Sequence, residues 1–336
     1  MKILITGITG MVGSHLLDFL MENTDYEIVG IARWRSPLNN IADHIPAINS
    51  KNRITLEHCD ITDNLGVENL FSKHKFKFIF HLAAQSYPHV SFSNPHETYK
   101  TNINGTENIL NATLKYSPDA IIHVCSSSEV FGRVPKEKVP IDEETSFHPA
   151  SPYAISKCGT DLIGRYYAEA YNLNTQITRM FTHTGPRRGD VFMESTFAKQ
   201  IALIEFGYQE PIVKVGNLES LRTIADVRDA VRAYFLLVTT KNIPSGSVFN
   251  IGGKYTTTVG SILEKLISLS ISERISHELD ESRVRPIDAD LQIPDISAFK
   301  KYTNWEPKYS FDETMKDLLD YWRKLVDKNG NVYLQR

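Results

Sequence analysis

The stretch Ile3-Leu-Ile-Thr-Gly7-Ile-Thr-Gly10-Met-Val-Gly13 places a short apolar run directly before three glycines, and a leucine-rich helical pattern follows. In such a strand–turn–helix unit the first glycine permits a tight turn, the second lets a pyrophosphate approach the main chain, and the third lets the helix pack close to the strand. The phosphates then lie at the helix N-terminus, where unpaired N–H groups and the helix dipole favour anions. The motif therefore predicts a dinucleotide site made by Gly7, Thr9, Gly10, Met11, Val12 and Gly13.

Outward from this turn, the first half of the chain alternates strand-like and helical runs. A helix is expected at Ser14–Glu22, and strands are expected at Ile3–Thr6, Glu27–Ala32, Ile54–His58, Phe78–Leu82 and Ala120–Ser126. Several of these runs are apolar nearly throughout, as in parallel strands that are buried on both faces. The alternation predicts an α/β fold, a Rossmann-type doubly wound parallel sheet with right-handed crossovers.

After about Arg179 glycines and prolines interrupt this pattern. Thr223–Leu237 is predicted to be helical, Ser247–Ile251 to be a strand, and Phe311–Leu325 to be an amphipathic helix packed on the core. We therefore expect residues 1–180, joined by 222–252, to form the dinucleotide-binding domain. Residues 181–221 and 253–336 are expected to form a smaller, mixed α/β substrate domain.

Composition excludes several classes of protein. The 336 residues are 41% apolar and 23% charged, so the chain can fill a core and is not intrinsically disordered. A formal net charge of −3 argues against nucleic acid or an anionic membrane as a partner. Three well-separated cysteines support neither a disulfide framework nor a metal site, and no apolar run reaches the length of a membrane span. The first residues are predicted to be a strand and not a signal peptide, and a cytoplasmic location is expected.

The end of the second predicted strand indicates which dinucleotide binds. An NAD site usually carries a carboxylate there for the ribose 2′-hydroxyl, whereas this chain has Arg33, Arg35 and Ser36. Two guanidiniums and a hydroxyl suit a 2′-phosphate, so NADP is favoured over NAD, the alternative being a solvated basic loop. Asp60-Ile61 is placed to contact adenine, although Asp60 could equally cap the next helix. Leu82, Ala83 and Ala84, after the fourth strand, are also expected on the cofactor.

Two further segments carry candidate chemistry. Ser126-Ser-Ser-Glu129 follows the fifth strand, at the sheet edge where parallel α/β folds bind ligands, although it could be a plain capped turn. Tyr153 and Lys157 share one helical face after the helix-start signal Ser151-Pro152. A nearby ammonium and a positive nicotinamide ring would lower the pKa of the phenol, and the lysine can also hold the cofactor ribose.

Taken in this order, the glycine turn and the Tyr-x-x-x-Lys pair resemble the extended short-chain dehydrogenase/reductase family. HLAAQSYPHVSFSNP (81–95), CSSSEVFG (125–132), SPYAISK (151–157), THTGPRRGDVF (182–192) and VGNLESLR (215–222) are similar to GDP-mannose 4,6-dehydratases and the related GDP-4-keto-6-deoxymannose reductases. RWRSPLNNI (33–41) and PRRGDVF favour the dehydratases. The resemblance runs from Met1 to about Lys324 and implies a homodimer or homotetramer.

The resemblance implies a reaction without net oxidation. Tyr153 would take the proton of the sugar 4-hydroxyl while a hydride leaves carbon 4 for NADP, and Ser127 would hydrogen-bond oxygen 4. Glu129 would then remove the proton at carbon 5, water would leave across carbons 5 and 6, and the hydride would return to carbon 6. The product would be a GDP-4-keto-6-deoxy sugar.

Other matched positions concern binding. The resemblance places Asn102 as a support for Lys157, and Ser86 and Ser128 near the sugar. Arg222, Arg285 and Asp288 would contact the nucleotide, or could simply be members of surface ion pairs. Thr182 stands where the family usually has asparagine. The lysine that the dehydratases carry shortly after PRRG is absent here, where Ser195-Thr196 lies nearby, and Lys199 is expected to compensate for it.

Four functions remain open at this point. The first is a dehydratase acting on GDP-mannose. The second is a dehydratase acting on another GDP-sugar, such as an N-acetylhexosamine or a heptose, which the Thr182 departure motivates. The third is a GDP-4-keto-6-deoxymannose reductase that consumes NADPH. A non-enzymatic NADP-binding protein is the fourth, but such a protein should have lost the tyrosine, the lysine or the base.

Overall fold

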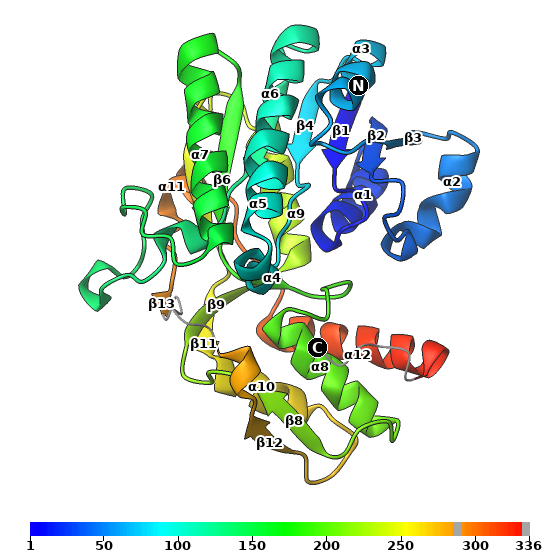
Figure 1. Cartoon of the computed structure of the whole chain (residues 1–336), viewed down its shortest axis with the longest axis vertical. Helices are drawn as coiled ribbons and strands as arrows, with labels where there is room; N and C mark the ends of the chain where they lie inside the picture. Colours follow the sequence, from blue (N-terminus) through cyan, green and yellow to red (C-terminus); the bar gives the residue numbers. More distant parts are fainter. Residues whose placement is uncertain (285–290, 331–336) are drawn as a thin grey trace.

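A seven-stranded, all-parallel sheet forms the larger part of the protein (Figure 1). The computed structural model describes residues 1–284 and 291–330. The strand order β10-β6-β5-β4-β1-β2-β3 contains the order 3-2-1-4-5-6 of doubly wound nucleotide-binding folds, so the predicted fold class is confirmed. The strands are β1 (Lys2–Thr6), β2 (Glu27–Ala32), β3 (Ile54–His58), β4 (Phe78–His81), β5 (Ile121–Cys125), β6 (Thr175–Met180) and β10 (Val248–Ile251).

Helices cover both faces of this sheet because alternate strand residues are apolar on both sides. Ile3 and Ile5 of β1 pack in one core with α1 (Met11–Asn23), α9 (Val227–Thr239) and α11 (Ser297–Thr303). Leu4, between them, faces a second core made with α3 (Asn64–Lys73), α6 (Gly105–Tyr116) and α7 (Pro152–Tyr171). The period of two in a strand thus sends neighbouring residues to opposite helical layers.

A smaller part of the chain lies beyond the large sheet and has its own core, formed by α8 (Met193–Glu205), α10 (Val259–Ser268) and α12 (Phe311–Asn329) (Figure 1). Strands β9 (Leu221–Asp226), β7 (His183–Thr184), β11 (Tyr255–Thr258) and β13 (Leu291–Gln292) make a mixed sheet, and β8 (Ile212–Val215) pairs with β12 (Ser276–Leu279). Shorter helices are α2 (Ile45–Asn49), α4 (Pro88–Ser93) and α5 (Pro95–Tyr99).

The structure corrects one predicted element. Thr223–Leu237 is not a single helix, because residues up to Asp226 belong to β9 and α9 begins at Val227. Asp226 ends the strand and caps the helix, since its side chain accepts a hydrogen bond from Arg228 N (2.8 Å). The chain therefore returns to the large sheet only after Asp226, through α9 and β10, and not from residue 222.

The fold depends on a close approach at Gly13, which generates a testable prediction. A Cβ at this position would lie 2.2 Å from the carbonyl oxygen of Gly7 and 2.8 Å from Cα of Ile8. These are main-chain atoms that cannot turn aside. We expect Gly13→Ala to lower the free energy of unfolding by about 1–3 kcal/mol or more, measured by urea denaturation.

Gly66→Ala in α3 is the matched control. A Cβ there would meet only the mobile end of the Asp63 side chain, at 3.1 Å, and alanine favours the helix. This variant should be neutral or slightly more stable. If Gly13→Ala and Gly66→Ala lower the free energy of unfolding equally, the close packing of α1 on the turn after β1 is not the reason that position 13 requires glycine.

Candidate active site

A long cleft lies at the carboxyl ends of the strands of the large sheet and continues onto the smaller part of the chain. Its volume is about 1180 Å³, above the roughly 300–1000 Å³ of a pocket for one small ligand. The walls come from the ends of β1 to β5 and, on the other side, from residues that include Gly216, Arg222 and Val259. The cleft is therefore large enough for more than one small ligand.

The glycine turn forms one end of this cleft. Gly7 has φ +70°, and a Cβ there would lie 3.0 Å from main-chain atoms of Ala83, so only glycine fits without strain. The hydroxyl of Thr6 accepts hydrogen bonds from Leu82 N (3.0 Å) and Ala83 N (2.9 Å), which holds these residues beside the turn. Gly10 begins α1 without a side-chain cap, so the helix start offers main-chain N–H groups. All of the predicted turn residues line the cleft: Gly7, Thr9, Gly10, Met11, Val12 and Gly13.

The ends of β2 and β3 border the same end of the cleft. Arg33 and Ser36 line it, and Ser36 N donates to Arg33 O (2.9 Å) to close a turn between them. Arg35 is exposed at the outside of that turn and does not line the cleft, contrary to the prediction. Asp60 lines the cleft and also accepts hydrogen bonds from the N and Oγ1 of Thr62, both at 2.9 Å. The next helix, α3, has Asp63 at its N-cap position and not Asp60.

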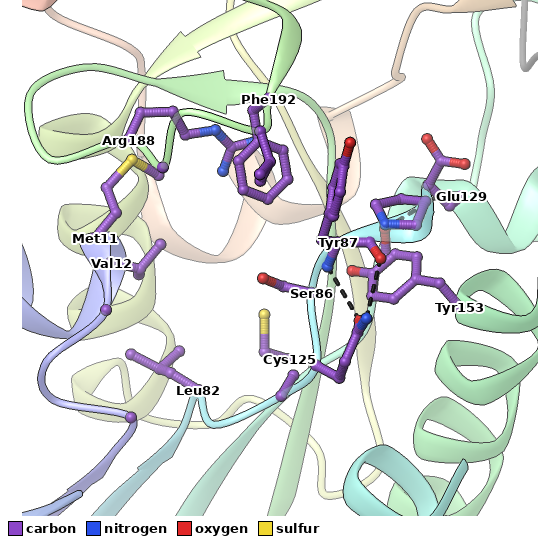
Figure 2. Close-up of a pocket in the computed structure, with 18 of the residues that line it drawn as sticks. Met11, Val12, Leu82, Ser86, Tyr87, Cys125, Glu129, Tyr153, Arg188 and Phe192 are labelled. Atoms are coloured by element: carbon purple, nitrogen blue, oxygen red, sulfur yellow. Dashed lines mark hydrogen bonds between the residues drawn. The ribbon is translucent and has the colours of Figure 1, made fainter. Parts of the chain in front are cut away.

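Ser127, Glu129, Tyr153 and Lys157 line the middle of the cleft. Ser127 is the N-cap of the short 3₁₀ turn Ser128–Phe131, and its Oγ accepts a hydrogen bond from Glu129 N (3.2 Å). The serine segment is thus both a capped turn and part of the candidate site. Figure 2 shows Glu129 and Tyr153 on the same side of the cavity.

Helix α7 presents the tyrosine and the lysine together. Pro152 occupies its first turn and the Ser151 side chain caps it, accepting from Ala154 N at 3.0 Å. Lys157 Nζ lies 5.9 Å from the centre of the Tyr153 ring and donates to the carbonyl oxygen of Cys125 (2.7 Å). The predicted pairing of Tyr153 and Lys157 on one helical face is therefore present.

The pKa of the Tyr153 phenol is raised in the protein alone, whereas the sequence predicted that it would be lowered. Burial raises the pKa of this phenol well above its usual value, although a hydrogen bond with Ser127 and the charge of Arg188 oppose the rise. Burial also lowers the pKa of Lys157. In the protein by itself the desolvation of the ring outweighs the favourable charges that the sequence suggested.

Asn102 supports the site differently from the prediction. It lies in a π-helical turn, Lys100–Asn104, and its Nδ2 donates to Ser156 Oγ and to Gln85 O, both at 2.9 Å. Its Oδ1 accepts from Gln85 N (2.8 Å). Asn102 therefore joins the loop after β4 to α7 through Ser156, the neighbour of Lys157.

Residues that the sequence reasoning missed complete the cleft wall. Arg188, in the loop after β7, stacks on Phe192 with 3.5 Å between its guanidinium carbon and the ring centre, and its Nε lies 3.3 Å from Glu194 Oε1. Figure 2 shows Arg188 and Phe192 across the cavity from Glu129. Tyr87 and His183 also line the cleft. The signal was available, since the quoted segment PRRGDVF contains a cation and an aromatic ring directly after a predicted loop.

The positions predicted to bind substrate divide into three groups. Lys199 does not line the cleft; it is buried on α8 with its Nζ 3.1 Å from Asp190 Oδ2, because nearly all of that helix is packed inside the smaller part. Arg285 and Asp288 lie outside the described residues. The positions that do line the cleft are Ser86, Ser127, Ser128, Thr182 and Arg222.

Within residues 1–284 and 291–330, no group of three or more His, Cys, Asp or Glu side chains is placed to hold a metal ion. In the same part of the chain, no helix combines the length and the apolar character that crossing a bilayer requires.

Known proteins resemble this chain over nearly its whole length. The sequence profile of the family described as GDP-mannose 4,6 dehydratase matches residues 4–318. A GDP-mannose 4,6 dehydratase of Drosophila melanogaster is 31% identical over 97% of this chain and 87% of its own length. A UDP-glucose 4-epimerase of Thermotoga maritima, solved with UDP-glucose, shares the fold with a TM-score of 0.84 and 28% identity, over 97% of this chain and 100% of its own. A dTDP-glucose 4,6-dehydratase of Bacillus anthracis has a TM-score of 0.80 and 24% identity, over 96% of this chain and 97% of its own.

The profile match covers far more than half of the chain. The chain therefore belongs to the GDP-mannose 4,6 dehydratase family.

The ion pair between the partly exposed Arg188 and the buried Glu194 gives a prediction on stability. Glu194→Ala would leave a guanidinium in the cleft wall without its carboxylate. We expect the free energy of unfolding to fall by about 3–5 kcal/mol, measured by chemical denaturation.

Lys115→Ala provides the comparison, since Lys115 and Glu68 form a 2.9 Å ion pair on the surface. Such exposed pairs contribute about 0–1 kcal/mol. A loss of under 1 kcal/mol for Glu194→Ala would show that Arg188 is solvated and not held by Glu194.

Proposed function

We propose that this member of the family is an NADP-dependent 4,6-dehydratase that converts GDP-mannose to GDP-4-keto-6-deoxymannose. The observation that carries the proposal is the gathering of Ser127, Glu129, Tyr153 and Lys157 in the cleft that begins at the glycine turn. A hydroxyl, a carboxylate, a phenol and an ammonium are the groups that oxidation at carbon 4 followed by loss of water requires.

The residues of the first half of the cleft fit a dinucleotide. The N–H groups at the start of α1 and its dipole suit a pyrophosphate, and the glycines leave room for it. Arg33 and Ser36 suit a 2′-phosphate, and no carboxylate stands among residues 33–42, directly after β2. Asp60 and Ile61 would lie at the adenine, and Lys157 would hold the ribose beside the nicotinamide. When bound, NADP supplies a ring that takes a hydride from carbon 4 and later returns it to carbon 6.

Tyr153 would act as the base at the sugar 4-hydroxyl. To accept this proton Tyr153 must be a phenolate, and the phenolate needs stabilisation because burial raises the pKa of the phenol. The hydrogen bond with Ser127 and the charge of Arg188 favour the phenolate, and Ser127 would also orient oxygen 4.

Glu129 would act after carbon 4 has become a ketone. The ketone acidifies the hydrogen on carbon 5, and the carboxylate would remove it. The hydroxyl of carbon 6 would then leave as water, taking the proton that Glu129 received. Each of these assignments is a proposal that rests on the position of Glu129 in the cleft and on the family resemblance.

The other half of the cleft would take the sugar nucleotide. Ser86, Ser128 and Thr182 would lie at the sugar, and Arg222 would meet the diphosphate. We infer that residues 181–226, 253–284 and 291–330 provide the sugar-nucleotide-binding part. A 4,6-dehydratase of another GDP-sugar is the second candidate, because Thr182 lines the cleft where the resembling proteins usually carry asparagine.

The function is tested by incubating the purified protein with GDP-mannose and without added reductant. We expect a 4-keto product, detected by mass spectrometry as loss of water, with no net NADPH consumed. Tyr153→Phe should slow this conversion by about 10²–10⁴-fold.

Other outcomes separate the alternatives. Turnover of GDP-4-keto-6-deoxymannose with NADPH, and none of GDP-mannose, would mean that the protein is a reductase. Loss of water from another GDP-sugar in a panel, and not from GDP-mannose, would favour the second candidate. A correctly folded protein with no turnover on any of them would leave a non-enzymatic NADP-binding protein.

The cofactor preference can be tested at Cys125, which lines the cleft and is partly exposed. Burial raises the pKa of Cys59 and of Cys158 to about 11, so both react slowly with iodoacetamide at pH 8. We expect NADP to protect Cys125 from alkylation at roughly 10- to 100-fold lower concentration than NAD, the effect of one charge-assisted hydrogen bond.

Arg33→Ala should abolish the difference between the two cofactors without removing protection by NAD. Cys158 does not line the cleft, so its slow alkylation should be the same with and without either cofactor and serves as the internal control. Equal protection of the unaltered protein by NAD and NADP would contradict the assignment of Arg33.

A further inference from the structure

Tyr87 lines the cleft at the end of the loop that joins β4 to α4. It is the N-cap residue of α4 and has an extended backbone, followed by Pro88 in the first turn of the helix. The Gln85 side chain brackets its main chain, with Nε2 donating to Tyr87 O and Oε1 accepting from Tyr87 N, both at 3.1 Å. Figure 2 draws these bonds beside the Tyr87 ring. Residue 87 is therefore held by contacts that fix its backbone.

This loop is anchored to the helix that carries Tyr153. Asn102 binds Gln85 on one side and Ser156 on the other, and Ser156 Oγ donates to Tyr153 O (2.6 Å). In α4, which follows the loop, Ser91 Oγ accepts a hydrogen bond from Tyr153 N (3.0 Å). Two chains of hydrogen bonds thus fix the loop relative to the main chain of Tyr153.

The ring of Tyr87 is fixed as well. Its centre lies 5.9 Å from that of Phe192 and 5.9 Å from that of His89, in both cases edge to face. In Figure 2 the ring stands between Phe192 and Glu129, with its hydroxyl directed into the cavity. Tyr87 and Glu129 therefore face the same space from two different loops.

We propose that Tyr87 is a further catalytic residue, whose hydroxyl donates a hydrogen bond to the oxygen on carbon 6 of the hexose as that oxygen leaves. The inference rests on the proposed dehydratase function, in which Glu129 works at carbon 5 and the leaving group is on the next carbon. In the proposed reaction Tyr153 acts at carbon 4 and Glu129 at carbon 5. The Tyr87 hydroxyl, which shares the cleft with Glu129, would then lie at the oxygen on carbon 6.

The step balances without any further reactant. The C5–H bond breaks and its electrons form the C5=C6 bond, while the C6–O bond breaks. The proton that Glu129 takes from carbon 5 goes to the departing oxygen, which leaves as water. Tyr87 keeps its own proton and stabilises the charge that grows on the oxygen during bond cleavage.

The test is Tyr87→Phe, which keeps the ring and its packing and removes only the hydroxyl. Turnover of GDP-mannose should fall roughly 10- to 100-fold, as for loss of one hydrogen bond to a developing charge. Oxidation at carbon 4 should continue, so reduced cofactor should accumulate on the enzyme and absorb at 340 nm.

A substrate whose leaving group needs no proton gives the second readout. With GDP-6-chloro-6-deoxymannose the variant should recover to within about 3-fold of the unaltered enzyme, because chloride leaves as an anion. Tyr166→Phe is the control, since Tyr166 is exposed on the same helix as Tyr153 and bonds only weakly to Tyr171 (3.4 Å). Its turnover should not change.

Two results would overturn the inference while leaving the proposed function intact. One is unaltered turnover of GDP-mannose by Tyr87→Phe. The other is an equal loss with the hydroxyl and chloro substrates together with slowed oxidation at carbon 4, which would make Tyr87 a structural residue. If the unaltered enzyme does not convert GDP-mannose at all, the proposed function fails and not the assignment of Tyr87 within it.

Discussion

The contact between Gly13 and the carbonyl of Gly7 is the constraint on which the rest of the site depends. It lets α1 begin directly above the end of β1, with no side chain between the helix and the turn. The free N–H groups of the helix then face the edge where β4 and β5 also end. A bulkier residue would displace α1, and with it the surface that an anionic ligand would meet, from the groups at the ends of those strands.

Much of the larger part could be predicted because its signals are local. Apolar runs located six of the seven parallel strands to within a residue at each end, whereas β6 was not predicted, and Ser151-Pro152 marked the start of α7. The division at Asp226 was missed because the residues before it are compatible with either a helix or a strand. Pairing with β7, β11 and β13, which are separate in the sequence, decides for the strand.

The site was predicted less completely than the fold, for a related reason. The end of β5 pointed to Ser127, and the Tyr-x-x-x-Lys spacing pointed to Tyr153 and Lys157; all three line the cleft. Such signals do not say which way a side chain on a distant helix turns, so Lys199 was expected in the cleft and lies buried on Asp190. Arg188 was missed because its place in the cleft wall depends on the conformation of its loop, where the guanidinium stacks on Phe192 and lies beside Glu194.

The two hydrogen bonds between the Gln85 side chain and the main chain of residue 87 have a consequence for substitutions at that position. Both bonds from Gln85 end on the main chain of residue 87, so they would persist whatever side chain stood there. The loop therefore holds residue 87 by its main chain, independently of its side chain. The hydroxyl of residue 87 can therefore be removed, as in Tyr87→Phe, while the main-chain anchor of the loop to Gln85 stays as it is.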